Sequence, residues 1–419
     1  MKVVVWGLGV SGLSAVRYLS QNIELDLYVV SMGAPKTWSD FTEVCRFLPQ
    51  EKLLAQEDLT ENFDVDQVIL SPGVPRYLPI IKSLIDRGVE FISDIELAAR
   101  NINRPIIAIT GTNGKTTTTT LISNALKIAG KNVFTGGNIG IGVCDYFLKP
   151  ERDYDYVVLE LSSFQLESIS SFRAHIAIIL NISENHMERY NDFSEYESAK
   201  LNIRINQSSE DWFIAPKKYL TPDVHSKKAI IKKINNLNVI NKNLSGDHNL
   251  ENLFCTNAVL EILDIQNSKL IIKELIETYK GIDFRLQFIK SINKTLFYND
   301  AKSTNTAATI VALNSFSSKK LGLILGGKLR DKGQKLFNDF KDQEIEIIFA
   351  IGEAKELINS ELETKFKVKK FNGIADIFKD ESNFENLDVV LFSPAFPSFD
   401  SYKNYMERGK HFNDLVRGI

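Results

Sequence analysis

Residues 106–120 read IIAITGTNGKTTTTT, and this stretch decides how the chain folds around it. An apolar run leads into a glycine-containing turn, and Lys115, Thr116 and Thr117 follow at the start of an apolar helix. A strand, a turn and a helix in this order direct backbone N–H groups at an anion. Lys115 would reach the outer phosphates of a nucleotide, and the Thr116 hydroxyl would bind Mg²⁺. The stretch predicts an ATP site on a parallel α/β sheet.

The phosphate-binding pattern of this stretch is incomplete. In G-x-x-x-x-G-K-[ST] the first glycine would stand at position 109, which is Ile109, whereas the first glycine here is Gly111. A Gly-Asn turn before a threonine-rich helix, without any ligand, is therefore an open alternative. The lysine and the two threonines directly after the turn favour the phosphate site.

The bulk properties of the chain narrow its class. A length of 419 residues predicts two or three domains, each with its own core. The formal net charge of −3 gives no nucleic-acid signature. Cys45, Cys144 and Cys255 are too widely spaced for a disulfide framework, which suits a reducing cytosol. No apolar run approaches the roughly 20 residues of a membrane span, and the N-terminus does not resemble a signal peptide. We expect a soluble, cytoplasmic protein.

Strand-like and helix-like runs alternate along the whole chain, which is typical of an α/β fold. Strands are expected at KVVVW, LDLYVV and DQVIL, then at IIAIT, YVVLEL and AHIAIILNI, and finally at TLFYND, LGLILGG, IEIIFAIG and DVVLFSPA. Helices are expected near residues 11–21, 78–88 and 249–263. Residues 215–245, rich in Lys and Asn, are expected to form a surface insertion or an edge. Three units are predicted, with boundaries at 1–94, 95–281 and 282–419.

A second glycine turn lies at residues 7–12, GLGVSG, directly after the first predicted strand. The pattern G-x-G-x-x-G favours a nucleotide diphosphate at a helix N-terminus. An NAD site also needs an acidic residue at the end of the second strand, and this strand ends at Val30 and Ser31. Asp26 lies within that strand, out of reach of a ribose. A diphosphate other than NAD, or a tight turn without a ligand, remains open.

Polar side chains follow two strands of the predicted central sheet, where ligand sites form in open α/β sheets. Glu160 ends the strand YVVLE beside the phosphate turn, and a carboxylate there suits Mg²⁺. His186 follows the strand AHIAIILNI. A capping residue and a hydrogen-bonded surface histidine are the respective alternatives. Lys200, in YESAKLNI, has the pattern of an ordinary helical lysine.

A third polar cluster ends a strand in the last unit. Asp300, Lys302 and Thr304 lie in FYNDAKSTNT, where a helix is predicted to begin. This cluster would bring a carboxylate, an ammonium and a hydroxyl to one strand end, unless it only caps the helix. Groups that could bind a carboxylate follow the strand DVVLF: Ser393, Ser398 and Lys403.

Taken together, these motifs resemble the Mur ligase family over essentially the whole chain. GTNGKTT marks the superfamily, which includes folylpolyglutamate synthases. More specific motifs follow in the family's order: GGNIG, LELSSFQLE, LNISENHMERY, GDHNLEN, NDAKSTN, LILGG and SPAFPSFDSYKNYMERG. The best match within the family is the ligase that adds D-glutamate to UDP-N-acetylmuramoyl-L-alanine, a cytoplasmic step of peptidoglycan precursor synthesis.

The resemblance implies three α/β domains: a Rossmann-like domain for the UDP-sugar, a central P-loop-type ATPase, and a Rossmann-like C-terminal domain. It implies a monomer that uses ATP and two Mg²⁺ ions and acts on small molecules, with no membrane partner.

The resemblance also implies a set of site residues. The ATP residues it implies are Gly111, Thr112, Asn113, Gly114, Lys115, Thr116, Thr117, Asn249, Asn252, Arg285 and Asp300. The metal ligands are Thr116, Glu160, His186 and Lys200, the last as a carbamate. The UDP-sugar contacts are Val10, Ser11, Gly73, Asn138 and His186. The D-glutamate contacts are Lys302, Thr304, Arg330, Ser398, Phe399 and Tyr405. The catalytic set is Lys115, Glu160, His186, Lys200 and Lys302.

Several positions depart from the family pattern. Asn185 stands where Asp usually precedes the histidine, and Phe284 stands where His usually precedes the arginine. Ser31 and Met32 replace a Thr-Arg or similar pair near the uracil, so recognition there is expected to be weaker or backbone-based. Arg330 follows LILGG where the family often has a lysine that binds glutamate.

Three other functions are weighed against this one. A folylpolyglutamate synthase would begin directly at the ATPase, without the glycine turn of residues 7–12. A nucleotide sensor built on a degenerate ligase would not need the metal-binding residues Glu160, His186 and Lys200. An NAD oxidoreductase lacks the acidic residue described above.

Overall fold

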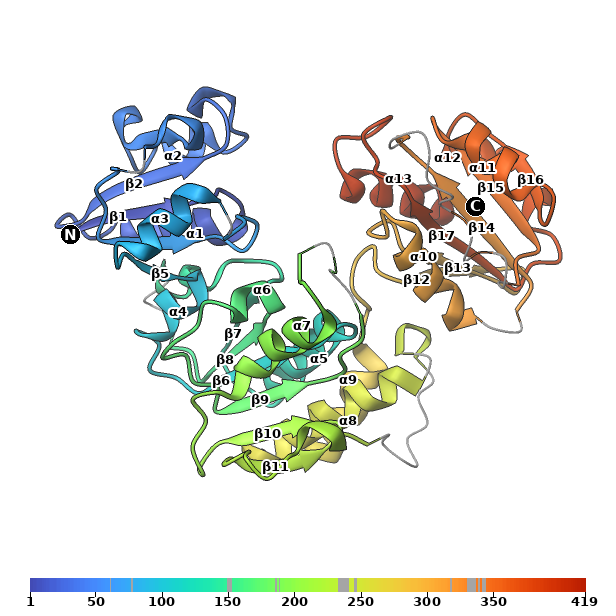
Figure 1. The fold of residues 1–419 in the computed structure, drawn as a ribbon. Helices are drawn as coiled ribbons and strands as arrows, with labels where there is room; N and C mark the ends of the chain where they lie inside the picture. The colour runs from blue at the N-terminus through green and yellow to red at the C-terminus, as the bar shows by residue number, and fades with distance from the viewer. Residues whose placement is uncertain are drawn as a thin grey trace. The chain divides into compact units, whose positions relative to one another are not determined.

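The computed structural model describes residues 1–60, 62–76, 78–148, 153–184, 187, 189–232, 241–244, 247–316, 319–329, 337, 340 and 344–419. The chain forms two compact units, and each is described by itself. The first comprises Met1–Leu237 with Asp247–Leu275, and the second comprises Asn238–Gly246 with Ile276–Ile419. The first unit holds two sheets and the second holds one, as the labels of Figure 1 show.

The first sheet is parallel, with the strand order β3-β2-β1-β4-β5. Its central strand, β1, sends Val3 and Val5 into one core and Val4 and Trp6 into another. Both faces of the strand are therefore covered, which explains the uninterrupted apolar run KVVVW. The elements are β1 (Lys2–Trp6), α1 (Val10–Leu19), β2 (Asp26–Ser31), α2 (Phe41–Val44), β3 (Leu53–Ala55), β4 (Gln67–Leu70), α3 (Pro79–Asp86), β5 (Glu90–Ile92) and α4 (Asp94–Ala99).

The second sheet is also parallel, with the order β11-β10-β9-β6-β8-β7. Strand β6 is central and fully buried, and its Ile109 is in register with Glu160 of β8. The carboxyl ends of these two strands therefore meet at one edge of the sheet. The elements are β6 (Ile106–Thr110), α5 (Lys115–Ile128), β7 (Val133–Gly137), β8 (Tyr156–Glu160), α6 (Ser163–Leu166), β9 (Ile176–Ile179), α7 (Phe193–Leu201), β10 (Trp212–Ala215), β11 (Lys227–Ile230), α8 (Asp247–Ile262) and α9 (Ser268–Thr278).

The third sheet lies in the second unit and has the order β12-β13-β17-β14-β15-β16. Strand β12 is antiparallel to β13, and the other pairs are parallel. The elements are β12 (Gln287–Ile292), β13 (Thr295–Asn299), α10 (Thr306–Leu313), β14 (Leu321–Gly326), β15 (Ile347–Ile351), α11 (Lys355–Leu362), β16 (Lys367–Lys370), α12 (Ile374–Ile377), β17 (Val389–Ala395) and α13 (Tyr405–Gly418).

The structure confirms the α/β class and every strand that the apolar runs predict. It adds short strands that the sequence did not reveal, such as β3 and β5. In the Lys- and Asn-rich stretch, Lys227–Ile230 forms the edge strand β11, and residues 233–240 lie outside the described residues. Within the described part of the chain, no helix has the length and apolar character needed to cross a bilayer.

Candidate active site

The phosphate turn joins β6 to α5 and is shaped by two glycines. Gly111 has φ 153° and Gly114 has φ 83°, a region in which side chains are strained. Gly114 is the N-cap of α5 and offers no side chain to cap the helix. The first N–H groups of α5 are therefore available to an anion, and the phosphate site stays a prediction.

Lys115 and the segment after β9 hold this turn in shape. The Lys115 ammonium donates to the carbonyls of Gly111 and Thr112, each at 2.9 Å. The carbonyl of Asn181 accepts from the N–H of Thr112 at 2.9 Å, and its side-chain oxygen accepts from the N–H of Asn113 at 2.9 Å. These hydrogen bonds hold the turn in shape without a ligand, and they place a positive charge beside the predicted phosphate position.

Glu160 and Lys200 are buried beside the turn, and each is 2% exposed. Oε1 of Glu160 accepts from the amide of Asn138 at 2.9 Å, whereas Oε2 has no hydrogen-bond partner among the described residues. Lys200, on α7, donates to the carbonyl of Gly111 at 3.0 Å. Burial lowers the pKa of Lys200 to about 7, and the charge of Lys115 adds to this effect. The structure thus gathers a free carboxylate oxygen and two amines around one turn.

This set of donors fits a magnesium–nucleotide. Mg²⁺ prefers oxygen ligands and usually takes only one or two carboxylates, with water and phosphate completing its shell. The unpartnered Oε2 of Glu160 is such a ligand, and buried Thr116 lies in the first turn of α5, as predicted. Within the described residues, no cluster of three or more His, Cys, Asp or Glu side chains could hold a metal on its own.

The two predicted adenine-side asparagines are brought to the same place by α8. The amide of Asn252 donates to Oδ1 of Asn249 at 3.0 Å, and its own oxygen accepts from the Thr118 hydroxyl at 3.0 Å. A Cβ on Gly114 would lie 3.1 Å from Oδ1 of Asn252. The asparagine pair therefore packs directly against the start of α5.

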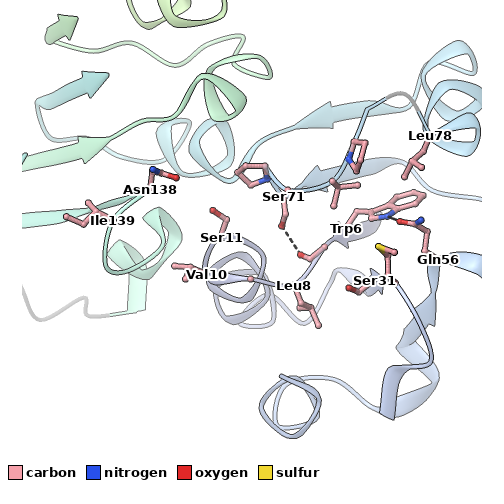
Figure 2. A pocket seen from close by; sticks show the side chains of 18 of the residues that line it. Trp6, Leu8, Val10, Ser11, Ser31, Gln56, Ser71, Leu78, Asn138 and Ile139 are labelled. Carbon is pink, nitrogen blue, oxygen red and sulfur yellow. Dashed lines mark hydrogen bonds between the residues drawn. The ribbon is translucent and has the colours of Figure 1, made fainter. Parts of the chain in front are cut away.

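A pocket of about 620 Å³ lies at the carboxyl ends of the first sheet, around the turn of residues 7–12 (Figure 2). Its lining includes the predicted UDP-sugar residues Val10, Ser11, Gly73 and Asn138. None of the described residues that line it carries a charge. Asp26 begins β2 and pairs with Lys52 at 2.5 Å, so it does not line the pocket that an NAD ribose would need.

Asn138 connects this pocket to the phosphate turn. It lines the pocket, and its amide donates to Glu160 at 2.9 Å. One end of the pocket therefore leads to the buried carboxylate at the end of β8. Figure 2 shows Asn138 and Ser11 at that end, and Trp6 and Gln56 at the other.

The polar cluster of the second unit is built around Asp300, which follows β13. Its carboxylate accepts from the Ser393 hydroxyl at 2.8 Å and from the N–H of Leu286 at 3.1 Å. Burial raises the pKa of Asp300 to about 6, although these hydrogen bonds oppose the shift. The exposed side chain of Lys302 and the partly exposed Thr304 follow at the same strand end.

Three further predicted residues lie in the segment after β17. Ser398 is buried, Phe399 is 64% exposed, and Tyr405 begins α13. The ring of Tyr405 meets that of Phe284 edge to face, with the centroids 6.4 Å apart. Phe284, where the family usually has histidine, thus fills an apolar contact. Arg285 adjoins it and is partly exposed.

Three predicted positions lie outside the described residues: Asn185, His186 and Arg330. Their roles stay predictions. Sequence reasoning also missed two contacts that shape the site: Asn181 against the phosphate turn, and the indole N–H of Trp6 bound to Gln56 at 3.0 Å. The motif that contains Asn181 was quoted, but nothing in the sequence pairs Trp6 with a residue fifty positions away.

The chain is similar to known proteins over its whole length. A model of the Mur ligase middle domain matches residues 109–229, and one of the MurD-like N-terminal domain matches residues 1–93. The UDP-N-acetylmuramoylalanine–D-glutamate ligase of Geotalea daltonii is 33% identical over 458 residues, covering 100% of this chain and 97% of that protein. The ligase of the same name from Christiangramia forsetii is 34% identical over 462 residues, covering 100% and 99%.

A solved structure has the same fold. The UDP-N-acetylmuramate-alanine ligase MurC of Thermotoga maritima superimposes with a TM-score of 0.58 at 19% identity, covering 100% of this chain and 99% of that chain. At this identity the likeness concerns the fold alone. The full-length sequence relatives and the two domain models go further, and they show that the chain belongs to the Mur ligase family.

Proposed function

We propose that this protein is an ATP-dependent ligase that joins D-glutamate to UDP-N-acetylmuramoyl-L-alanine, a step of peptidoglycan precursor synthesis. The observation that carries the proposal is the preformed phosphate turn beside Glu160, in a chain whose full-length relatives bear that enzyme name. We place the reaction in the cytoplasm, where ATP is available, and propose a monomer.

The reaction needs activation because a carboxylate is a poor electrophile. The L-alanyl carboxylate attacks the γ-phosphorus of ATP and ADP leaves, which gives an acyl phosphate. The D-glutamate amine then attacks the acyl carbon, phosphate leaves, and the nitrogen loses a proton. Mg²⁺, when bound, neutralises phosphate charge. Lys115 and the N–H groups of α5 would hold the phosphates beside the attacking carboxylate.

The remaining roles are distributed over both units. Asn249 and Asn252 would contact the adenine, and Val10, Ser11, Gly73, Asn138 and His186 would contact the UDP-sugar. Arg285 and Asp300 would complete the ATP site. Lys302, Thr304, Arg330, Ser398, Phe399 and Tyr405 would bind D-glutamate.

We also propose that Lys200 is carbamylated and supplies a second anionic ligand for Mg²⁺, together with His186. Its amine is buried, forms no ion pair among the described residues, and lies near the partner-free oxygen of Glu160. The ammonium of Lys200 first loses one proton. The neutral amine then adds to CO₂ and releases a second proton, so that a buried cation becomes an anionic carbamate. Protein labelled with ¹³C-bicarbonate should show a carbamate carbon signal by NMR. Lys200→Arg should lose it and Lys127→Arg, an exposed control on α5, should keep it.

The test of the main reaction is phosphate release from Mg-ATP in the presence of UDP-N-acetylmuramoyl-L-alanine. Release with D-glutamate, but not with L-glutamate or meso-diaminopimelate, is the expected result. Release with another amino acid would keep the ligase chemistry but change the substrate. ATP binding without release in any mixture would support the degenerate sensor instead.

A further inference from the structure

The neutral pocket at the first sheet has a polar side chain with no assigned role, at the end away from Asn138. We propose that the side-chain amide of Gln56, held by the indole N–H of Trp6, recognises the base of the nucleotide and favours uracil over cytosine. The inference rests on the proposed function, because it assumes that the pocket binds the nucleotide part of the substrate.

The two ends of the pocket can be distinguished by their neighbours. Asn138 is hydrogen-bonded to Glu160 beside the phosphate turn, so the reacting end of the substrate must lie there. The diphosphate fits the turn between β1 and α1, where Gly9 is an N-cap without a side-chain hydrogen bond. In dinucleotide-binding folds the residue at the end of the second strand contacts the ribose. That residue is Ser31 here, so we infer that the base lies beyond it, away from the helix. Gln56 directly follows β3, the neighbour of β2.

The orientation of the Gln56 amide is fixed by chemistry. The indole N–H of Trp6 can only donate a hydrogen bond, so the atom 3.0 Å away must be the oxygen of Gln56. Trp6 is itself fully buried in the core of the first sheet and cannot turn away. The NH₂ group of Gln56, for which the described residues offer no acceptor, is therefore available as a donor.

Several polar groups near this end already form hydrogen bonds within the protein. The carbonyl of Met32 accepts from the indole N–H of Trp38 at 2.9 Å, and the N–H of Gly33 donates to Glu57 at 3.0 Å. The Ser71 hydroxyl donates to the carbonyl of Gly7 at 2.7 Å. The backbone around Met32 is thus braced, and its carbonyl already accepts one hydrogen bond.

The side chains around Gln56 suit a flat ring. Leu8, Val74 and Leu78 line the pocket, and Met32 lies at its rim with 72% of its surface exposed. An exposed apolar side chain at the mouth of a pocket loses water contact when a ligand covers it. The base would gain apolar contact from these residues and its specificity from the one amide.

The chemistry of the two pyrimidines makes the preference testable. Uracil presents the acceptor O4 where cytosine presents the donor N4–H₂. The NH₂ group of Gln56 pairs with the acceptor and faces a second donor in cytosine. A glutamate at position 56 would still accept from Trp6, but it would present an acceptor to the pocket and so favour cytosine.

The experiment titrates the full-length protein with UDP and with CDP and follows tryptophan fluorescence. The wild type should bind UDP about tenfold more tightly than CDP. Gln56→Glu should weaken UDP binding by about tenfold and reverse the preference. Trp6→Phe, which frees the amide to turn, should bring the ratio of the two affinities towards one. Gln50→Glu, an exposed control with the same change of charge, should match the wild type.

Equal binding of UDP and CDP by the wild type, no binding of either at millimolar concentration, or an unchanged ratio in Gln56→Glu would overturn the proposal. The assay needs no turnover, so its outcome is independent of the amino acid that the enzyme uses. A ligase that prefers another amino acid would still show the uracil preference. A protein that releases phosphate only with D-glutamate, yet does not discriminate UDP from CDP, would contradict the role of Gln56 alone.

Discussion

The first unit contains two strand–glycine-turn–helix junctions whose surroundings differ. One joins β1 to α1 and the other joins β6 to α5. Each has a glycine with positive φ, 92° at Gly7 and 83° at Gly114, and neither helix is capped by a side chain. Lys115, Glu160 and Lys200 surround the second junction, whereas none of the described residues that line the pocket at the first is charged.

We infer from this difference that the first junction only binds a phosphate group, whereas the second takes part in phosphoryl transfer. A diphosphate that only anchors a substrate is stabilised by backbone N–H groups and the helix dipole. A γ-phosphoryl group in transfer spreads its charge over new oxygens, and fixed charges lower the energy of that state. We therefore expect substitutions at the second junction to affect kcat, and those at the first to affect binding or stability.

The largest effect should come from Lys115→Ala. Loss of the ammonium removes both the bonds that shape the turn and the charge on the transferred phosphate, so phosphate release should fall by about a thousandfold or more. Circular dichroism should show an unchanged fold. Lys127→Ala, on the exposed side of the same helix, is the matched control. Near-normal turnover in Lys115→Ala would break the comparison between the two junctions.

Glu160→Gln should reduce kcat by about a hundredfold and raise the Mg²⁺ concentration needed for half-maximal rate. The substitution removes the negative charge of Oε2 and keeps an oxygen for the amide of Asn138. The KM for the UDP-sugar should change little. A change confined to that KM would place Glu160 with the substrate pocket instead of the metal.

Glu96 tests the connection between the two sheets of the first unit. Burial would raise its pKa, but hydrogen bonds from the Ser171 hydroxyl and the N–H groups of residues 170–172 outweigh burial and lower the pKa to about 2. The folded pKa lies below the unfolded value of 4.5, so this contribution is complete above pH 4.5 and lost as the pH falls towards 2.

Urea unfolding at pH 7 should therefore show Glu96→Gln destabilised by about 3 kcal/mol. The difference in the free energy of unfolding between the variant and the wild type should become smaller as the pH falls from 4.5 to 3. Glu90→Gln is the control, because Glu90 is about half exposed and bonded mainly to Arg100. If this difference did not change with pH, the stabilisation by Glu96 would come from the packing of its side chain and not from its charge.

The smallest effect is expected for glycines of the first junction. A Cβ on Gly12 would lie 2.0 Å from the carbonyl of Gly7, so Gly12→Ala should destabilise the fold by about 1–3 kcal/mol and weaken UDP binding. Gly9→Ala meets nothing within 4 Å and should leave the melting temperature unchanged. Equal melting temperatures for the two variants would show that the turn adapts.

The strands of the three sheets and the turn before α5 could be predicted because their signals are local in the sequence. An apolar strand is followed directly by glycines and then by a helix. The sequence did not predict β3 or β5, since three-residue strands give no periodicity to detect. Glu160 could be singled out from its place at the end of a strand. The role of Lys200 depended on resemblance, because its burial against Gly111 comes from a contact across 89 positions. The Trp6–Gln56 bond has the same non-local origin.

The hydrogen bond between Asn138 and Glu160 connects the pocket of the first sheet with the proposed cation position, so binding at the two places should be thermodynamically linked. A ligand that draws the Asn138 amide into the pocket would free Oε1 of Glu160 from its hydrogen bond. Both carboxylate oxygens of Glu160 would then be available to a cation. The free energy of that coupling is the same whichever partner arrives first. We therefore expect two dissociation constants for the cation, one when the pocket is filled and one when it is vacant.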